Sequence, residues 1–191
     1  RGLGDVYKRQ NSNNVGGIVG YINGQVTVDS CYNRGSCTSG SWRAGGIAAY
    51  LNSSYAKVQN CYTTDTTKVT YGSNNMAVVG SKSSTSKMQN CYYLGTVGTD
   101  SNAAAKTADE LKELANTLGD EFVTAPAGIN DGYPILSWQI PTYTVTFTVK
   151  TGTGEDEKPV ADAVVTIDGQ TGTQGENGEW TFKLPDGTYA Y

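Results

Sequence analysis

Apolar and polar positions repeat with a fixed period over the first half of the chain. The dipeptide Cys-Tyr occurs three times, at 31–32, 61–62 and 91–92, so the period is 30 residues. An apolar residue stands three positions before each cysteine. Self-similarity of this kind is typical of stacked repeats, whose members bury too little apolar surface to fold alone. The pattern predicts one buried column of Val28, Val58 and Met88, with Cys31, Cys61 and Cys91 close by.

A second apolar block precedes each Cys-Tyr pair. It reads Gly-Gly-Ile-Val-Gly-Tyr at 16–21, Gly-Gly-Ile-Ala-Ala-Tyr at 45–50 and, in degraded form, Met-Ala-Val-Val-Gly-Ser at 76–81. Two short β segments are therefore expected in each repeat, paired in parallel with those of the next and wound right-handed. The inward residues are predicted to be Ile18, Ile47 and Val78. The opposite phase is nearly as apolar and holds Val19, Ala48 and Val79.

Small polar residues directly before the cysteines predict a corner in every repeat. Ser30, Asn60 and Asn90 occupy this position. Asn tolerates left-handed backbone, and its side chain can bond to neighbouring turns. The second repeat is longer by one residue, which is expected in the polar loop 52–54, where an insertion costs little free energy.

The glycine-rich block followed by Asn-Cys-Tyr resembles the GLUG repeat, a module of large bacterial surface and secreted proteins. The repeats themselves span about residues 14 to 95, and the resemblance with its closing segment extends to about residue 138. The third copy departs from the pattern because it lacks both leading glycines and the block's tyrosine. The resemblance implies a short parallel β-helix-like solenoid of three repeats.

A helix is predicted after the repeats. Thr107 and Glu110 form a capping-box pattern, and Gly119 marks the helix end. One helix face is apolar and holds Leu111, Leu114, Ala115 and Leu118. A turn at 130–132 then leads into a short strand. We expect this segment, residues 107–140, to lie as a cap across the exposed end of the last repeat, with its acids on a solvated face.

The remaining residues, 141–191, show β alternation with Gly and Pro turns. Four strands are expected, at 143–149, 164–167, 180–184 and 188–191. The pattern resembles the prealbumin-like, immunoglobulin-like stalk domains of bacterial surface proteins and implies an incomplete β-sandwich. Some such domains crosslink a strand lysine to an asparagine. The alternation places Lys150 on the solvent face, so an ordinary exposed lysine is expected.

The overall expectation is an all-β chain in four parts. Residues 1–10 look like the translated transposon end used in sequencing-library preparation, and we expect them to be foreign to the protein. Residues 11–106 form the repeat solenoid, 107–140 the cap and 141–191 the incomplete sandwich. Strand-rich composition agrees, with 24 Gly and 13 Tyr among 191 residues.

The side chains offer little catalytic chemistry. The sequence contains no histidine, which removes Ser-His and Cys-His pairs and histidine-ligated zinc. The repeats hold only three acids, Asp29, Asp65 and Asp100, and they fall in no common column. A glycosidase needs two carboxylates on one surface. We therefore expect no enzyme activity, no catalytic residues, no cofactor and no metal site.

The four cysteines are expected to be reduced and mostly buried. They contain no Cys-x-x-Cys pair, which argues against zinc. Equivalent cysteines on parallel neighbouring strands point the same way, a poor geometry for a disulfide. A Cys31–Cys37 disulfide through the turn at Gly35 stays open as an alternative.

The tyrosines after the cysteines should face outward if the cysteines face inward. Tyr32, Tyr62 and Tyr92 would then form an exposed ladder, and Tyr21 with Tyr50 part of a second. Such rings either stack on sugar rings or on one another to hold the register, and the second role needs no partner.

Charge and resemblance lead to a function hypothesis. Residues 11–106 hold seven Lys or Arg against three acids, too sparse for nucleic-acid binding. No membrane insertion is expected. We expect a non-catalytic display or adhesion module, extracellular, on the cell surface or in the cell wall, that binds a glycan or protein of a host or cell surface. The alternatives are an accessory region of a secreted peptidase and a carbohydrate-binding module.

Overall fold

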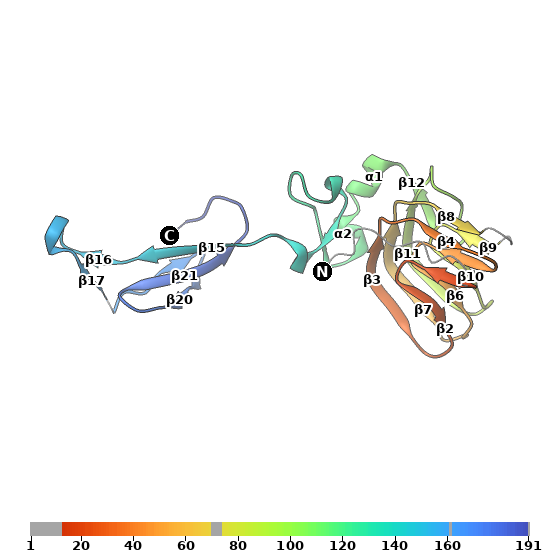
Figure 1. Ribbon diagram of the computed structural model, residues 1–191, viewed down its shortest axis with the longest axis horizontal. Helices are drawn as coiled ribbons and strands as arrows, with labels where there is room; N and C mark the ends of the chain where they lie inside the picture. The colour runs from red at the N-terminus through yellow and green to blue at the C-terminus, as the bar shows by residue number, and fades with distance from the viewer. Residues whose placement is uncertain (1–12, 70–73, 161, 191) are drawn as a thin grey trace. The chain divides into compact units, whose positions relative to one another are not determined.

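A computed structural model describes residues 13–69, 74–160 and 162–190 (Figure 1). The chain is largely β-structure and divides into two compact units, of which the first ends at Gln139 and the second begins at Ile140.

Three parallel strands, one from each repeat, hold the predicted columns. They are β3 (Thr27–Asn33), β7 (Lys57–Thr63) and β11 (Lys87–Leu94), and β12 (Ala104–Lys106) adds a fourth at the edge of β11. The register pairs Val58 with Val28 and Met88, and Cys61 with Cys31 and Cys91. Val58 and Cys61 are fully buried. The predicted columns are therefore confirmed, with Met88 and Cys31, in the two outer repeats, only partly buried.

The glycine-rich blocks form two further parallel sheets. One contains β1 (Asn14–Gly16), β5 (Arg43–Gly45) and β9 (Asn74–Met76), and the other β2 (Val19–Ile22), β6 (Ala48–Leu51) and β10 (Val79–Lys82). A short pair joins β4 (Cys37–Ser39) to β8 (Thr67–Val69). The prediction of two β segments per repeat was too low, because strands of three residues leave no visible alternation.

The corners before the cysteines are left-handed, as predicted. Ser30, Asn60 and Asn90 have φ of 50°, 52° and 52°. The side chains connect the repeats, because Asn90 Nδ2 donates to Asn60 Oδ1 at 2.8 Å and Asn60 Nδ2 donates to Asp29 Oδ1 at 2.8 Å. The extra residue also lies where predicted. Pairing shifts from Ile22–Leu51 to Thr27–Lys57, so the insertion falls in the loop before β7.

The bend between the two strands of each glycine-rich block explains both the glycines and the inward residues. A Cβ at Gly45 would collide with the carbonyl oxygen of Ala48. Ile47 and Val78 are fully buried as predicted, but Ile18 is 45% exposed and its inward placement was wrong. Ile18 belongs to the first repeat, which forms the edge of all three sheets. Residues of the opposite phase, Ala48 and Val79, are buried as well, because strict alternation is lost at the bend.

At the bend of the third repeat, a carboxylate accepts the last backbone hydrogen bonds of the ladder. The amides of Ile47 and Ala48 donate to Val78 O at 2.9 and 3.2 Å, and the amides of Ile18 and Val19 donate in the same way to Ile47 O. In the third repeat the amides of Val78 and Val79 instead donate to Asp100 Oδ2, at 3.1 and 3.0 Å. Asp100 is only 5% exposed. Its carboxylate therefore replaces the carbonyl that a further repeat would supply.

Residues 107–139 form a covering segment of short elements. These are α1 (Ala108–Lys112), α2 (Ala115–Leu118), β13 (Phe122–Val123), the 3-10 turn η1 (Asn130–Gly132), β14 (Ile135–Leu136) and the 3-10 turn η2 (Ser137–Gln139). The capping box of Thr107 and Glu110 is present. The single predicted helix is divided in two at Glu113 and Leu114, and Gly119, with φ of 107°, ends the second part.

The covering segment does not lie across the end of the stack, which corrects the prediction. Its leucines pack against the outer face of the β3–β7–β11 sheet, in one cluster with Tyr62. The edge itself is already occupied by β12 and Asp100.

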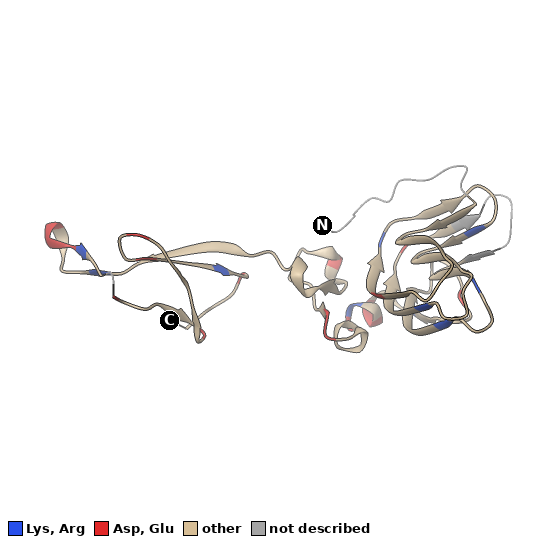
Figure 2. Cartoon of the chain, turned by 90° about the horizontal axis from the view of Figure 1, so that it is seen from below, with Lys and Arg blue, Asp and Glu red and all other residues tan. Residues whose placement is uncertain are grey.

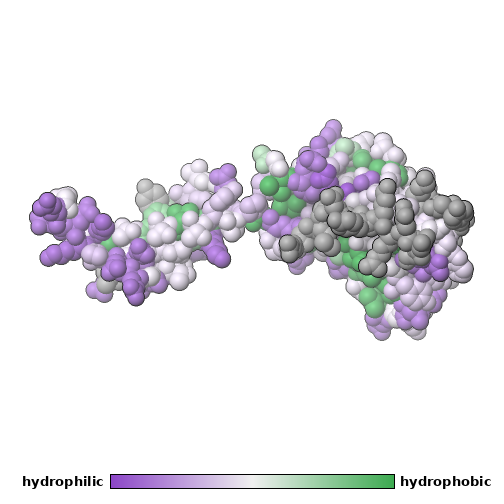
Figure 3. Space-filling model, viewed as in Figure 1, coloured by the Kyte–Doolittle hydropathy of each residue, from purple (hydrophilic) through white to green (hydrophobic). Residues whose placement is uncertain are grey.

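The second unit is a small antiparallel structure. Its main sheet joins β15 (Tyr143–Thr148), β21 (Glu179–Leu184) and β20 (Thr173–Gln174). Two hairpins pair β16 (Lys150–Thr151) with β17 (Lys158–Pro159), across the 3-10 turn η3 (Gly154–Asp156), and β18 (Thr166–Ile167) with β19 (Gln170–Thr171). Hydrophobic residues gather beside β15 and β21, whereas hydrophilic residues cover the β16–β17 hairpin (Figure 3).

The last expected strand of this unit and the exposure of Lys150 can be compared with the structure. The strand expected at 188–191 is not formed by residues 188–190, where Ala190 bonds instead to Asp168, and Tyr191 lies outside the described residues. Lys150 is exposed as predicted, and its Nζ lies 2.9 Å from Glu157 Oε2. An exposed ion pair of this kind contributes little to stability.

The first prediction tests the buried column. Val58→Asp should unfold the stack, because an unpaired buried carboxylate costs several kcal/mol. Thermal melting followed by circular dichroism would measure this. Val26→Asp is the control, because Val26 is 46% exposed and should change the melting curve little. An unchanged melting temperature for Val58→Asp would contradict the inward assignment.

The second prediction tests the closing carboxylate. Asp100→Ala leaves two buried amides without an acceptor and should lower the free energy of unfolding by about 2 to 4 kcal/mol. Asp100→Asn keeps one oxygen acceptor and should lose less. Urea titration of both variants measures the difference. Wild-type stability in Asp100→Ala would show that the carboxylate does not stabilise the last repeat.

Candidate functional site

The tyrosine ladder of Tyr32, Tyr62 and Tyr92 is the first candidate surface. It faces away from the interior of the stack, as predicted, and the rings of Tyr32 and Tyr62 stack with centroids 5.2 Å apart and planes 4° apart. Its expected exposure is wrong. Tyr62 is fully buried, and the rings of Phe122 and Tyr133 lie 6.0 and 6.5 Å from it. The covering segment therefore shields the middle of the ladder from any ligand.

The phenol groups of the ladder are bonded within the protein. Tyr62 Oη donates to Pro134 O at 2.5 Å and accepts from Asn130 Nδ2 at 3.2 Å. Tyr32 Oη donates to Gln139 Oε1 at 3.1 Å, and Tyr92 Oη donates to Asn90 Oδ1 at 2.7 Å. The ladder holds the covering segment in place.

An arginine of the first repeat attaches the same segment. Arg34 donates to Asn130 Oδ1 at 2.9 Å, forms an ion pair with Asp131 and lies 4.9 Å above the ring of Tyr133. The hydrogen bond and charge of Arg34 hold the pKa of Asp131 below its usual value. Arg34, Tyr62 and Tyr32 thus contact residues 130–139 from two repeats.

The cysteines form part of the core. All four are free thiols, so the alternative Cys31–Cys37 disulfide is absent. Asn33 Nδ2 lies 3.5 Å from Cys37 Sγ, and burial raises the pKa of the Cys37 thiol to about 11. Thiol contacts with Cys31 and Cys91, together with burial, raise the pKa of Cys61. Cys37 and Cys61 are therefore poor nucleophiles at neutral pH, whereas the hydrogen bond with Cys61 lowers the pKa values of Cys31 and Cys91.

Each acid of the repeats is bonded locally. Burial raises the pKa of Asp29, but hydrogen bonds from Asn60, Gln59 and Ser30 outweigh it and hold the pKa below its ordinary value. Asp65 accepts from the amide of Thr66 at 2.6 Å, and Asp100 closes the backbone ladder. These contacts give all three carboxylates a structural role.

Charge and metal-ligand chemistry single out no site among the described residues. No group of three or more Cys, Asp or Glu there could hold a metal ion. Lys and Arg are scattered over the first unit, and acids gather at η3 in the second (Figure 2). No helix in the described part of the chain is both long and apolar enough to cross a membrane.

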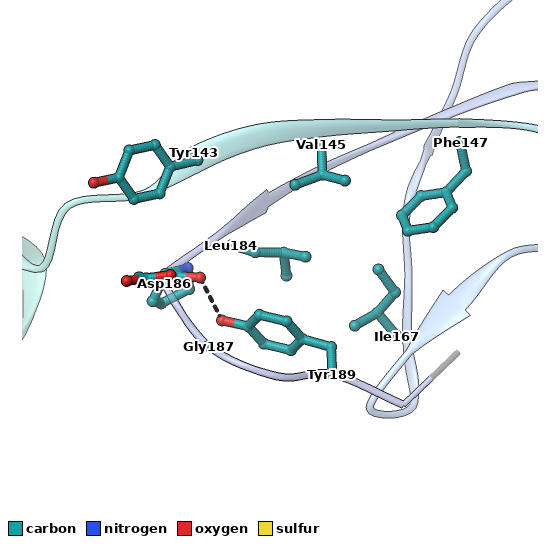
Figure 4. A pocket seen from close by; sticks show the side chains of 9 residues that line it. Tyr143, Val145, Phe147, Ile167, Leu184, Asp186, Gly187 and Tyr189 are labelled. Carbon is teal, nitrogen blue, oxygen red and sulfur yellow. Dashed lines mark hydrogen bonds between the residues drawn. The ribbon is translucent and has the colours of Figure 1, made fainter.

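An apolar groove of about 400 Å³ lies in the second unit (Figure 4). Its walls come from β15, β18, β21 and the loop after β21, with Val145, Phe147 and Leu184 among the lining residues. Tyr189 crosses one side and its Oη donates to Pro185 O at 2.6 Å. The lining side chains belong to the apolar core face that the alternation predicted, so we interpret the groove as packing surface.

The outer aromatic row is an exposed candidate site on the first unit. It consists of Trp42, Arg43, Tyr50 and Tyr21. Trp42 is 58% and Tyr21 48% exposed. The Arg43 guanidinium lies 3.9 Å above the Tyr50 ring and 5.4 Å from that of Trp42, and the rings of Tyr50 and Tyr21 are 5.5 Å apart with planes tilted by 53°.

Amide side chains fix the geometry of this row. Asn52 accepts from Tyr50 Oη at 2.6 Å and donates to Tyr21 Oη at 2.8 Å and to Asn23 Oδ1 at 3.0 Å. Arg43 Nη1 donates to Asn14 Oδ1 at 3.3 Å. The parallel register places Tyr21 beside Tyr50, and Ser81 continues the position in the third repeat. The row is therefore built by the stack itself.

Half of this row was predicted from the sequence. Tyr21 was paired with Tyr50, but Trp42 and Arg43 were not included. The available signal was an aromatic and a cation one residue before the glycine-rich block. The first and third repeats have Asn13-Asn14 and Ser73-Asn74 at these positions.

Comparison with known proteins adds no relative. The chain matches no protein-family model, no curated protein and no solved structure. The functional interpretation therefore depends on the residues described above.

The third prediction concerns alkaline pH. Burial raises the pKa of Tyr62, whereas an unfolded tyrosine titrates near pH 10. Above that pH the unfolded chain loses a proton that the folded chain keeps, so the free energy of unfolding falls as pH rises. In Tyr62→Phe this fall should be shallower by about 1.4 kcal/mol per pH unit. Equal slopes would contradict the burial.

The same variant should also be less stable at neutral pH. Asn130 and Pro134 lose a partner, at a cost of about 1 to 3 kcal/mol. Urea titrations from pH 7 to 11 give both quantities. Tyr55→Phe is the matched control, since Tyr55 is 70% exposed and should change neither.

Proposed function

We propose that the chain is a non-catalytic adhesion and display module of a large extracellular bacterial protein, at the cell surface or in the cell wall. In this proposal the first unit is a short β-solenoid of GLUG-like repeats. The second is part of an immunoglobulin-like stalk. The partner is a glycan or a protein on a host or neighbouring cell.

The outer aromatic row is the observation that carries this proposal. Trp, Tyr and Arg are the residue types that dominate binding energy at recognition surfaces. Trp42 and Tyr21 are about half exposed, although both belong to a stack of repeats joined by many hydrogen bonds. Hydrogen bonds of Asn52 already hold both tyrosines of the row, so binding there orders few side chains.

The structural use of the other conspicuous side chains supports the same proposal. The tyrosine ladder, the cysteine column and the three acids all bond within the first unit. Parallel pairing in register keeps every surface residue at a set position. A stack of this kind suits the presentation of a surface.

The fourth prediction tests adhesion directly. The fluorescently labelled full chain should bind to cultured epithelial cells, and the double variant Trp42→Ala, Tyr21→Ala should bind at least ten-fold less. Trp138→Ala is the control, because Trp138 is 60% exposed but lies in the covering segment. Flow cytometry measures the bound fluorescence. Equal binding of the double variant and wild type would overturn the assignment of the row.

A further inference from the structure

The outer aromatic row has the composition and size of a small-ligand site rather than a protein interface. Two half-exposed rings, at 150–250 Å² each, offer roughly 200 Å² of aromatic surface. A stable protein interface needs about 800 Å² from each partner. The row therefore favours a small ligand that can bind through contacts with two or three aromatic rings.

The chemistry of the row suits a sugar. A pyranose ring has an apolar C–H face and a polar rim. Trp42 and Tyr21 are large exposed aromatic residues of the row. Among the amide side chains of the row, Asn52 bonds to Tyr21 and Asn23, and Asn14 bonds to Arg43. Aromatic faces bordered by hydrogen-bonding groups match both parts of such a ring.

Arg43 adds a charge preference. Its guanidinium lies 3.9 Å from the centre of the Tyr50 ring and 5.4 Å from that of Trp42. Among the described residues the ion pairs involve Arg34, Lys106, Lys112 and Lys150 but not Arg43. Residues 11–106 also carry a formal charge of +4, from seven Lys or Arg and three acids. A guanidinium binds carboxylate through two parallel hydrogen bonds.

We infer that the outer aromatic row binds a carboxylate-bearing saccharide. Trp42 and Tyr21 stack on sugar rings, and Arg43 pairs with the carboxylate. This inference rests on the proposed adhesion function and names the ligand class for it.

A pair of matched ligands tests the inference on the isotopically labelled full chain. Sialyllactose and lactose differ by the acidic sugar, and each is titrated while the indole N–H resonance of Trp42 is followed by NMR. We expect sialyllactose to shift this resonance and to bind at least five-fold more tightly than lactose. The resonance of Trp138 should not move. Raising the salt concentration should weaken the binding of sialyllactose more than that of lactose.

Variants separate the contribution of aromatic stacking from that of the Arg43 charge. Trp42→Ala should weaken both ligands at least ten-fold, and Trp138→Ala neither. Arg43→Gln should remove the preference for sialyllactose but keep the lactose affinity, while Arg43→Lys should retain part of the preference because it keeps the charge. The spectra of each variant report whether its fold is intact, so a loss of binding can be assigned to the row.

The outcomes are distinguishable from those of the adhesion experiment. No shift with either sugar overturns the saccharide inference, and equal affinity for both overturns the carboxylate preference. If Trp42→Ala still abolishes cell binding in that case, the adhesion function stands with a ligand of another class. Sialidase treatment of the cells should reduce binding of the wild-type chain if the inference is correct.

Discussion

Parallel pairing in register between repeats is the constraint on which the first unit depends. Because residues of β7 pair with their equivalents in β3 and β11, a favourable residue type can recur at the same position in successive repeats. Apolar residues then form buried columns and Asn side chains bond from one corner to the next. The same pairing penalises an unsuitable residue type, because its side chain would lie next to the identical side chain of the neighbouring repeat.

The ends of such a stack need different solutions from its middle. At the third repeat, the Asp100 carboxylate and β12 provide the acceptor and the partner strand that a next repeat would supply. In the first repeat, Ile18 and Val26 are nearly half exposed, although their second-repeat equivalents are buried. Ile18 and Ile47 are thus the same residue at the same periodic position but have different surroundings, which explains why the inward placement was correct for Ile47 and wrong for Ile18.

Local and periodic features could be predicted from the sequence, and contacts between distant segments could not. The columns, the left-handed corners, the loop insertion and the capping box at Thr107 all follow from spacing and side-chain chemistry. The position of residues 107–139 over the tyrosine ladder depends on contacts between segments far apart in the sequence, such as Arg34 with Asn130 and Tyr62 with Pro134, which no short pattern encodes. The outer aromatic row was half found, because Trp42 and Arg43 have no equivalents in the other repeats and periodicity does not point to them.

The attachment of residues 130–139 to the first repeat also affects the order of folding. Tyr32 bonds to Gln139 across 107 positions, and Arg34 bonds to Asn130 across 96. During synthesis the first repeat leaves the ribosome long before these partners exist, and closing such long loops carries an entropic cost. Simple repeat arrays can gain their units one after another. Here the first repeat completes its contacts only after residue 139 has been made, so the segment synthesised last in this unit joins all three repeats through Tyr32, Tyr62 and Asn90.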